Sequence, residues 1–219
     1  MTTSAQTAYE QAFQAAITFT KEKRLLQLGA DKISTSTPAN YERARSRAVY
    51  ELEKAIIPGL KNAGVGEDVG EIKGDGEFWA LGSQCGNAHL HACNNIEDMR
   101  LPMSCHLTIG GVQVNSDHKA FPYTRAQFLQ DMEARPEIIR GHVWLTLGGE
   151  YIVDLTLGTW LTTAEKPYTQ YGSVISGVPG AFDYQNFLSD KSAVHNEPPV
   201  IYTPVAVGLD ALKSVAPLL

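Results

Sequence analysis

The feature that most constrains the fold is a pair of apolar runs, 142–147 and 150–157, separated by Gly148 and Gly149. Both runs are rich in β-branched and aromatic residues, which favour strands. Two glycines between such runs are typical of a β-hairpin, because tight hairpin loops need backbone conformations with positive φ. The chain is therefore expected to contain an antiparallel sheet built around these two strands.

The register of this hairpin decides which polar side chains meet. Alternate residues of a strand point to opposite faces, so only some registers bring the apolar residues of both strands to one face. A three-residue loop over 147–149 does so, and it places Thr146 opposite Glu150 and His142 opposite Asp154. A two-residue Gly-Gly turn would send His142 and Asp154 to opposite faces. The apolar pattern favours the first register, with both side chains on the face away from the core.

Helix and strand signals continue along the rest of the chain. Apolar spacing predicts a helix over 7–28 that stops at Gly29, and a second helix over 41–57 with Asn40 as its N-cap. The glycine-rich segment 62–76 is interpreted as a loop. The remaining expected elements are helices over 85–94, 124–134 (capped by Thr124) and 209–215, a weak helix over 184–189, a strand or hairpin over 106–114, and a strand over 201–207.

This order of elements, helices first and mostly antiparallel strands later, indicates an α+β fold. We expect residues 1–219 to form a single domain. Within it, residues 1–62 would form an N-terminal helical layer and residues 78–219 the core that carries the hairpin.

Composition argues against several classes of protein. The chain has 219 residues and a net charge of −6, whereas non-specific nucleic-acid binding and docking on anionic membranes both need a basic surface. Its apolar stretches are far shorter than the ~18 residues of a transmembrane helix, and its first residues lack the basic and apolar regions of a secretory signal peptide. We expect a cytoplasmic protein, with export by a signal-free route as the alternative.

The chain has three cysteines, an odd and small number that argues against a disulfide framework. Cys85 differs from the others because Gly82-Ser83-Gln84 ahead of it indicates that it begins a helix. The N-terminus of a helix favours the thiolate, and the Cys85 N–H would face a developing oxyanion. A nucleophilic thiol also needs a base and a third group that orients the base. His142 and Asp154 stand in the order expected for these two roles.

Taken together, these motifs resemble the transglutaminase-like branch of the papain-like superfamily. The matching features are Gln84-Cys85 at a helix start, a strand that opens His-Val-Trp at His142, and Asp154 in a Val-Asp-Leu-Thr run after the hairpin. Gln84 matches the Gln that often precedes the nucleophile, and Trp144 matches the Trp two positions after the base. The resemblance implies that Cys85 is the nucleophile, His142 the base and Asp154 the orienting acid.

The resemblance covers about residues 78–160, and the N-terminal helices have no counterpart in it. Gly86 departs from the family, where an aromatic residue often follows the cysteine. The resemblance implies a papain-like core in which the nucleophile begins a helix packed on an antiparallel sheet. It also implies acyl transfer or hydrolysis at an amide bond of a peptide, protein or small molecule, without a cofactor. Gln84, Trp79 and Trp144 are the residues expected to stabilise the oxyanion or to position the substrate.

Two other interpretations stay open on sequence grounds. On a helix, Cys85, His89 and Cys93 would form one stripe, which with His106 could hold a tetrahedral zinc ion. Alternatively, the chain could be a catalytically inactive member of the family that serves as a binding protein. Cys93 and Cys105 are expected to be buried, unreactive thiols.

Overall fold

A computed structural model gives the fold of the chain. It describes residues 3–26, 38–52, 54, 59, 67–71, 77–80, 85–114, 118–136, 138–158, 174–185 and 199–216. Its helices are α1 (Ser4–Glu22), α2 (Pro38–Glu51), α4 (Cys85–Asp98), α5 (Arg125–Ala134) and α7 (Leu209–Val215). Its strands are β1 (Glu67–Glu71), β2 (Glu77–Ala80), β3 (Cys105–Val114), β4 (His118–Phe121), β5 (His142–Leu147), β6 (Tyr151–Asp154), β7 (Val174–Val178), β8 (Ala181–Gln185) and β9 (Val200–Val207).

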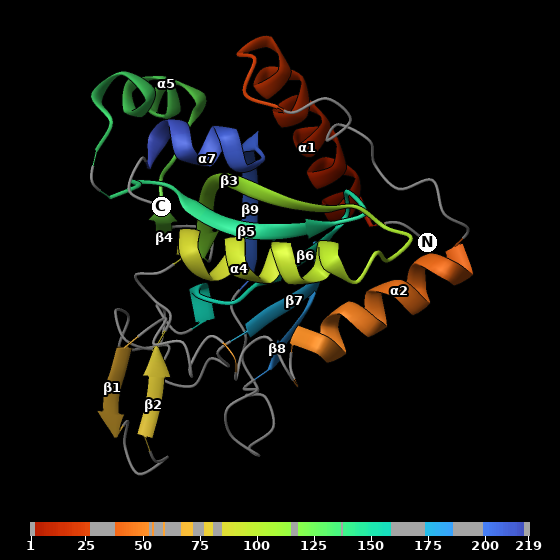
Figure 1. Ribbon diagram of the computed structural model, residues 1–219. Coiled ribbons are helices and arrows are strands. Elements are labelled where there is room, and N and C mark those ends of the chain that lie inside the picture. Colours follow the sequence, from red (N-terminus) through yellow and green to blue (C-terminus); the bar gives the residue numbers. More distant parts are fainter. Residues whose placement is uncertain are drawn as a thin grey trace.

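One antiparallel sheet organises the molecule (Figure 1). Six of its seven strands run in the order β4-β3-β5-β6-β7-β8, and the seventh, β9, pairs with β3. Strands β1 and β2 form a separate two-stranded antiparallel ribbon. Helices and an antiparallel sheet in one unit confirm the expected α+β class.

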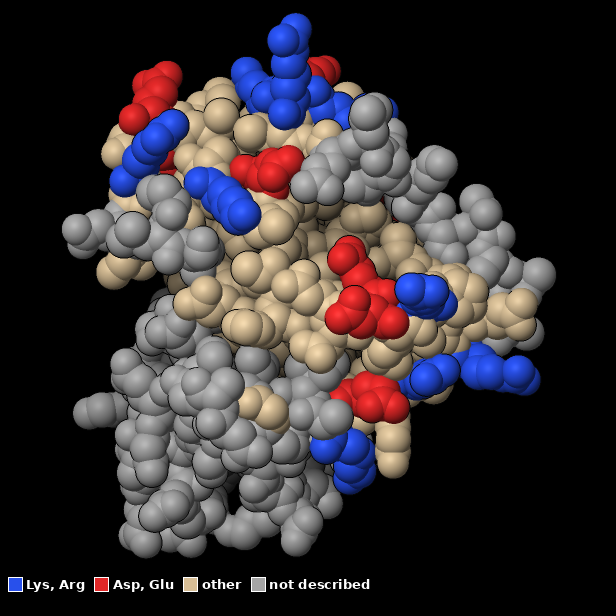
Figure 2. Space-filling view, viewed as in Figure 1, with Lys and Arg blue, Asp and Glu red and all other residues tan. Residues whose placement is uncertain are grey.

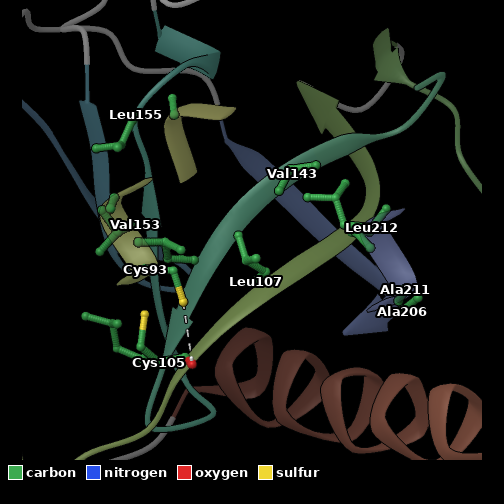
Figure 3. Close-up of a cluster of buried hydrophobic side chains, with 14 of the residues drawn as sticks. Cys93, Cys105, Leu107, Val143, Val153, Leu155, Ala206, Ala211 and Leu212 are labelled. Carbon is green, nitrogen blue, oxygen red and sulfur yellow. Dashed lines mark hydrogen bonds between the residues drawn. The ribbon is translucent and has the colours of Figure 1, made fainter. Parts of the chain in front are cut away.

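Both faces of the sheet are buried. On one face, α4, α5 and α7 pack against a cluster that includes Leu107, Val143 and Val153, and this cluster also encloses Cys93 and Cys105 (Figure 3). On the other face, α1 contributes residues such as Phe13 to a second cluster around Trp144 and Ile152. Successive side chains of a strand enter the two clusters in turn, with Val143 on one face of the sheet and Trp144 on the other.

The second layer corrects one expectation from the sequence. The apolar pattern predicts a face away from the core for His142 and Asp154, but they are 1% and 0% exposed. The reason is the second cluster, in which Phe121 and Trp144 stack on the His142 ring and Tyr202 contacts Asp154. Helix α1 adds Tyr9 and Phe13 to this cluster. The N-terminal residues thus line the sheet directly.

The two N-terminal helices differ in extent from the prediction. The first ends at Glu22, well before Gly29, because Arg24 takes a left-handed φ of 58° and breaks the helical path. The second begins at Pro38, a residue favoured at the first helical position, so Asn40 lies inside the helix and is not its cap. Residues 53 and 55–57, predicted to continue this helix, lie outside the described ranges.

The remaining predicted helices and strands are confirmed in part. Helix α4 is confirmed and runs four residues past 94, and Thr124 caps α5 by accepting from the N–H of Gln127. The helices α5 and α7 and the strand β9 lie where expected. The weak helix predicted over 184–189 is wrong at residues 184 and 185, which belong to β8, and 186–189 lie outside the described ranges. The segment 62–76 contains β1, so it is not simply a loop.

The Gly110-Gly111 pair lies inside the single strand β3 and does not turn a hairpin. A Cβ atom on Gly110 would lie 2.1 Å from the carbonyl oxygen of Thr203, and one on Gly111 would lie 2.9 Å from that of Tyr123. These glycines therefore allow neighbouring backbone to approach closely, the other common use of glycine in strands.

The surface carries charges of both signs. On the face shown in Figure 2, acidic and basic side chains are interspersed over the described part of the chain. Among the helices of the described ranges, none has the length and apolar composition needed to cross a membrane.

Candidate active site

In the hairpin that carries the site, each side chain lies on the expected face, but the pairing register is shifted by two residues. Leu147 pairs with Tyr151 and Thr146 with Ile152, so the loop is 148–150 and not 147–149. Thr146 therefore does not lie opposite Glu150, and Asp154 is displaced by one side-chain spacing from the position opposite His142. Since a shift of two residues keeps every side chain on its face, His142 and Asp154 still share a face, as predicted, and meet diagonally.

Contacts from elsewhere in the chain explain the shift. The N–H of Gly148 donates to the carbonyl of Ser104, and the hydroxyl of Tyr41 donates to the carbonyl of Leu147. A Cβ on Gly148 would lie 2.2 Å from the Tyr41 ring, and Gly148 has a φ of 61°. Leu147 is thereby kept in the strand, and the loop begins at Gly148.

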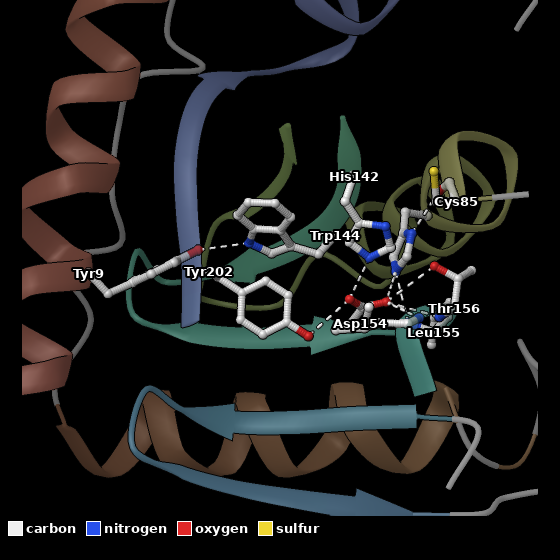
Figure 4. Close-up of polar contacts among 10 residues, drawn as sticks. Tyr9, Cys85, His142, Trp144, Asp154, Leu155, Thr156 and Tyr202 are labelled. Atoms are coloured by element: carbon white, nitrogen blue, oxygen red, sulfur yellow. Dashed lines mark hydrogen bonds and ion pairs between the residues drawn. The ribbon is translucent and has the colours of Figure 1, made fainter. Parts of the chain in front are cut away.

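The three residues of the expected triad lie at the ends of their elements. Cys85 is the first residue of α4, His142 the first of β5 and Asp154 the last of β6. Because β5 and β6 are antiparallel, the start of one and the end of the other lie at the same end of the sheet. Figure 4 shows Cys85, His142 and Asp154 gathered there.

The carboxylate of Asp154 accepts five hydrogen bonds from the described residues. Oδ2 accepts from Nε2 of His142 at 2.6 Å and from the hydroxyl of Tyr202 at 2.9 Å. Oδ1 accepts from the N–H groups of Thr156 and Leu157, both at 2.9 Å, and from the Thr156 hydroxyl at 3.2 Å. Burial raises the pKa of Asp154, but the charge of His142 and these hydrogen bonds outweigh it and hold the pKa well below the usual range. Asp154 is therefore ionised.

The imidazole of His142 is the centre of the site. Burial lowers its pKa, but the charge of Asp154, their hydrogen bond and the Cys85 thiol together raise the pKa to about 10. Phe121 stacks on the ring with centroids 4.7 Å apart and fixes its plane. Nε2 is used by Asp154, and Nδ1 is buried without a hydrogen-bond partner among the described residues. The ring thus has one nitrogen committed to the acid and one open toward the thiol.

Cys85 differs from the other two thiols in exposure. All three cysteines are free, but Cys85 is half-buried whereas Cys93 and Cys105 are buried. The N–H groups of the first helical turn have no acceptor within the helix, and they give this end a partial positive charge. The position suits a thiol that reacts as an anion.

Of the three residues expected to stabilise the oxyanion or to position the substrate, the structure describes the side chain of Trp144. Nε1 of Trp144, its single donor, donates to the hydroxyl of Tyr9 at 2.9 Å, and Tyr9 also contacts the Thr146 hydroxyl at 2.6 Å. Trp144 therefore belongs to the packing between α1 and the sheet and does not offer a donor to an oxyanion. Gln84 and the side chain of Trp79 lie outside the described residues.

The zinc interpretation finds no support in the described part of the chain. Both ring nitrogens of His89 are engaged, Nδ1 with the carbonyl of Cys85 at 2.7 Å and Nε2 with the N–H of Leu155 at 2.9 Å. The Cys93 thiol lies 3.9 Å from the carbonyl of Cys105. Over the described ranges, no three His, Cys, Asp or Glu side chains are grouped so as to hold a metal ion.

Two residues of the site were not identified from the sequence. Tyr202 reaches Asp154 from β9, 48 residues away along the chain, so no local pattern signals it. The sequence indicates His89 only as a possible metal ligand, although its spacing of four residues from Cys85 on one helix signals a contact between the two residues.

Comparisons with known proteins add no assignment. No protein-family model matches the chain, and no curated protein or solved structure matches it. The function of the protein is therefore inferred from the geometry of Cys85, His142 and Asp154.

Proposed function

We propose that this protein is a cysteine-dependent acyltransferase or hydrolase that acts at an amide carbonyl, as the transglutaminase-like motifs imply. One observation carries the proposal: His142 lies 2.6 Å from a buried, ionised Asp154 and leaves its other nitrogen open beside the Cys85 thiol. This is the order of nucleophile, base and orienting acid that acyl transfer needs.

The charges of the site suit a nucleophilic thiol at neutral pH. Asp154 is an anion, and the raised pKa of about 10 keeps His142 protonated. An imidazolium next to a thiol favours the thiolate, and the N-terminus of α4 acts in the same direction. In the proposed reaction Cys85 therefore attacks as a thiolate, with the protonated His142 beside it.

In the acylation step, the Cys85 sulfur adds to the carbonyl carbon of the amide and a C–S bond forms. The oxygen of the tetrahedral intermediate becomes an anion, which the Cys85 N–H at the start of α4 stabilises. His142 then gives its proton to the amide nitrogen, the C–N bond breaks and the amine leaves. The product is a thioester on Cys85.

In the second step, water or a primary amine adds to the thioester carbonyl. His142 takes the proton of the incoming group, and collapse of the tetrahedral intermediate breaks the C–S bond and releases the thiolate. The product is an acid when water attacks and a new amide when an amine attacks. Asp154 stays ionised throughout and orients His142.

The experiment is a screen of the purified protein against glutamine-containing peptides, with and without a primary amine. Ammonia release with a unit gain in mass identifies deamidation, incorporation of the amine identifies transglutamination, and shorter fragments identify peptidase activity. Cys85→Ala should abolish the reaction and Cys93→Ala should preserve it. If no peptide reacts and Cys85 alkylates no faster than an ordinary thiol, the inactive binding protein becomes the better description.

A further inference from the structure

His89 is a fully buried histidine that the proposed reaction does not use. Its ring lies between the carbonyl oxygen of Cys85, 2.7 Å from Nδ1, and the backbone nitrogen of Leu155, 2.9 Å from Nε2. A carbonyl only accepts and an amide N–H only donates, so Nδ1 carries the proton and Nε2 accepts. The ring thus links the peptide of the thiol-bearing residue to the peptide that follows Asp154.

The ring of His89 has to be neutral for this bridge to exist. Burial lowers its pKa to about 4, against the opposing effect of the Asp154 charge. The titratable groups that act on it are Asp154 on β6 and His142 on β5, and Cys85 on α4 contributes its backbone carbonyl. Nε2 of His89 is 3.7 Å from Oδ1 of Asp154. A protonated His89 would lose its bond from Leu155 and compete with His142 for the same carboxylate.

Two imidazoles next to one carboxylate therefore differ in charge. His142 bonds Asp154 directly and is held protonated, whereas His89 accepts a backbone hydrogen bond and is held neutral. When the surroundings give two groups of the same kind different pKa values, the two groups commonly have different roles in one site.

We propose that His89 is a positioning residue, whose neutral ring fixes the first turn of α4 against the end of β6 so that the Cys85 thiol faces His142. The inference rests on the proposed function, since it concerns the geometry of the proposed nucleophile. His89 acts through the backbone of Cys85 and takes no step in the acyl transfer itself.

The first measurement uses the unmodified full-length protein. Imidazole nitrogen chemical shifts recorded by NMR between about pH 5 and about pH 9 report the charge and tautomer of each ring. His89 should stay neutral with its proton on Nδ1, while His142 is protonated at neutral pH. A charged His89 at neutral pH, or a proton on its Nε2, overturns the proposal.

The second measurement separates positioning from simple packing. The rate of Cys85 alkylation by iodoacetamide is followed against pH in three variants. His89→Leu removes both hydrogen bonds, His89→Asn keeps a donor near the Cys85 carbonyl, and His89→Gln keeps an acceptor near Leu155. His89→Leu should slow alkylation at neutral pH by about tenfold or more, because small displacements of reacting groups are costly. His89→Asn should restore part of the rate.

A matched control comes from the same helix. His91 is exposed and lies two residues further along α4, so His91→Leu should leave the alkylation rate and its pH profile unchanged. Thermal unfolding is recorded for each variant. A folded His89→Leu with the wild-type pH profile overturns the proposal, even if its melting temperature falls, because His89 then only packs. If no variant folds, the NMR measurement alone tests the proposal. A neutral His89 with its proton on Nδ1 supports it, and a charged ring or a proton on Nε2 overturns it.

The failure of this inference differs from failure of the proposed function. Slow alkylation of Cys85 in the wild-type protein counts against the proposed function, whatever the His89 variants do. Fast alkylation in the wild type that persists in His89→Leu counts against the positioning role alone.

Discussion

The hydroxyl of Tyr202 donates a 2.9 Å hydrogen bond to Oδ2 of Asp154, the same oxygen that His142 contacts at 2.6 Å. Tyr202 comes from β9, and the backbone donors to Oδ1 come from residues that follow β6 (Figure 4). The acid is thus held from two sides by parts of the chain far apart in sequence. Loss of one donor should weaken this arrangement without neutralising the carboxylate.

Tyr202→Phe should therefore lower the free energy of unfolding by about 1.5–3 kcal/mol, the range for a hydrogen bond to a charged group. Four donors to Asp154 would remain, so the carboxylate should stay ionised. Urea unfolding at neutral pH measures the change. The control is Tyr50→Phe, whose side chain is 57% exposed and whose loss should cost less than about 0.5 kcal/mol. Equal effects of the two variants would show that the bond to Asp154 is unimportant.

Asp154→Asn should reduce turnover by about three to four orders of magnitude, as in other triads that lose the orienting carboxylate. An amide can still accept from Thr156 and Leu157, so the backbone after β6 should keep its path. The NH2 group of the asparagine, however, cannot accept the hydrogen bond that the Nε2–H of His142 donates to Asp154. The ring is therefore forced into the wrong tautomer. Circular dichroism checks the fold, and Asp98→Asn on the exposed end of α4 is the control. Near-full activity would mean that another residue orients His142.

The raised pKa of His142 predicts a loss of stability at alkaline pH. The folded-state pKa is about 10, above the unfolded value of 6.5, so the stabilisation is complete below 6.5 and disappears as pH rises toward 10. Loss of one proton gives a slope of at most about 1.4 kcal/mol per pH unit. The measurement uses the unmodified protein and is repeated with Cys85→Ala, which removes the contribution of the thiol and should leave a smaller shift in the same direction. Adding His142→Gln should make the free energy of unfolding nearly independent of pH between about 6.5 and 10. An unchanged slope would contradict the raised pKa of His142.

Substoichiometric iodoacetamide near neutral pH should label Cys85 well ahead of Cys93 and Cys105. Cys85 is half-buried at a helix start next to His142, while the other thiols are buried, and alkylation depends on access and on the thiolate. Peptide mass mapping can quantify all three sites in one digest. His142→Ala should slow labelling of Cys85, and denatured protein should label all three sites similarly. Preferential labelling of Cys93 or Cys105 would refute the nucleophile assignment.

The hairpin shows what periodicity can and cannot predict. A strand has a side-chain period of two, so the apolar pattern placed His142 and Asp154 on one face correctly. The same pattern is unchanged by a shift of two residues, so it could not determine where the loop begins. That choice depends on Tyr41 packing on Gly148, a contact between residues more than 100 positions apart.

Other features depend on contacts that leave no local trace. The start of α4 at Cys85 followed from small and polar residues ahead of a helical pattern. The role of Trp144 did not follow, because its N–H is satisfied by Tyr9 on a helix at the other end of the chain. The strand at residues 181–185 was also missed, since its pairing with β7 overrides a weak helical preference.

The burial of the His142–Asp154 pair has a consequence for how the site responds to its surroundings. Phe121, Trp144, Tyr202 and His89 pack around the two side chains, which are almost inaccessible to water and ions. Dissolved salt screens charges that it can surround, over about 10 Å at 0.1 M, and screens buried pairs much less. The attraction between this imidazolium and this carboxylate should therefore be nearly independent of ionic strength.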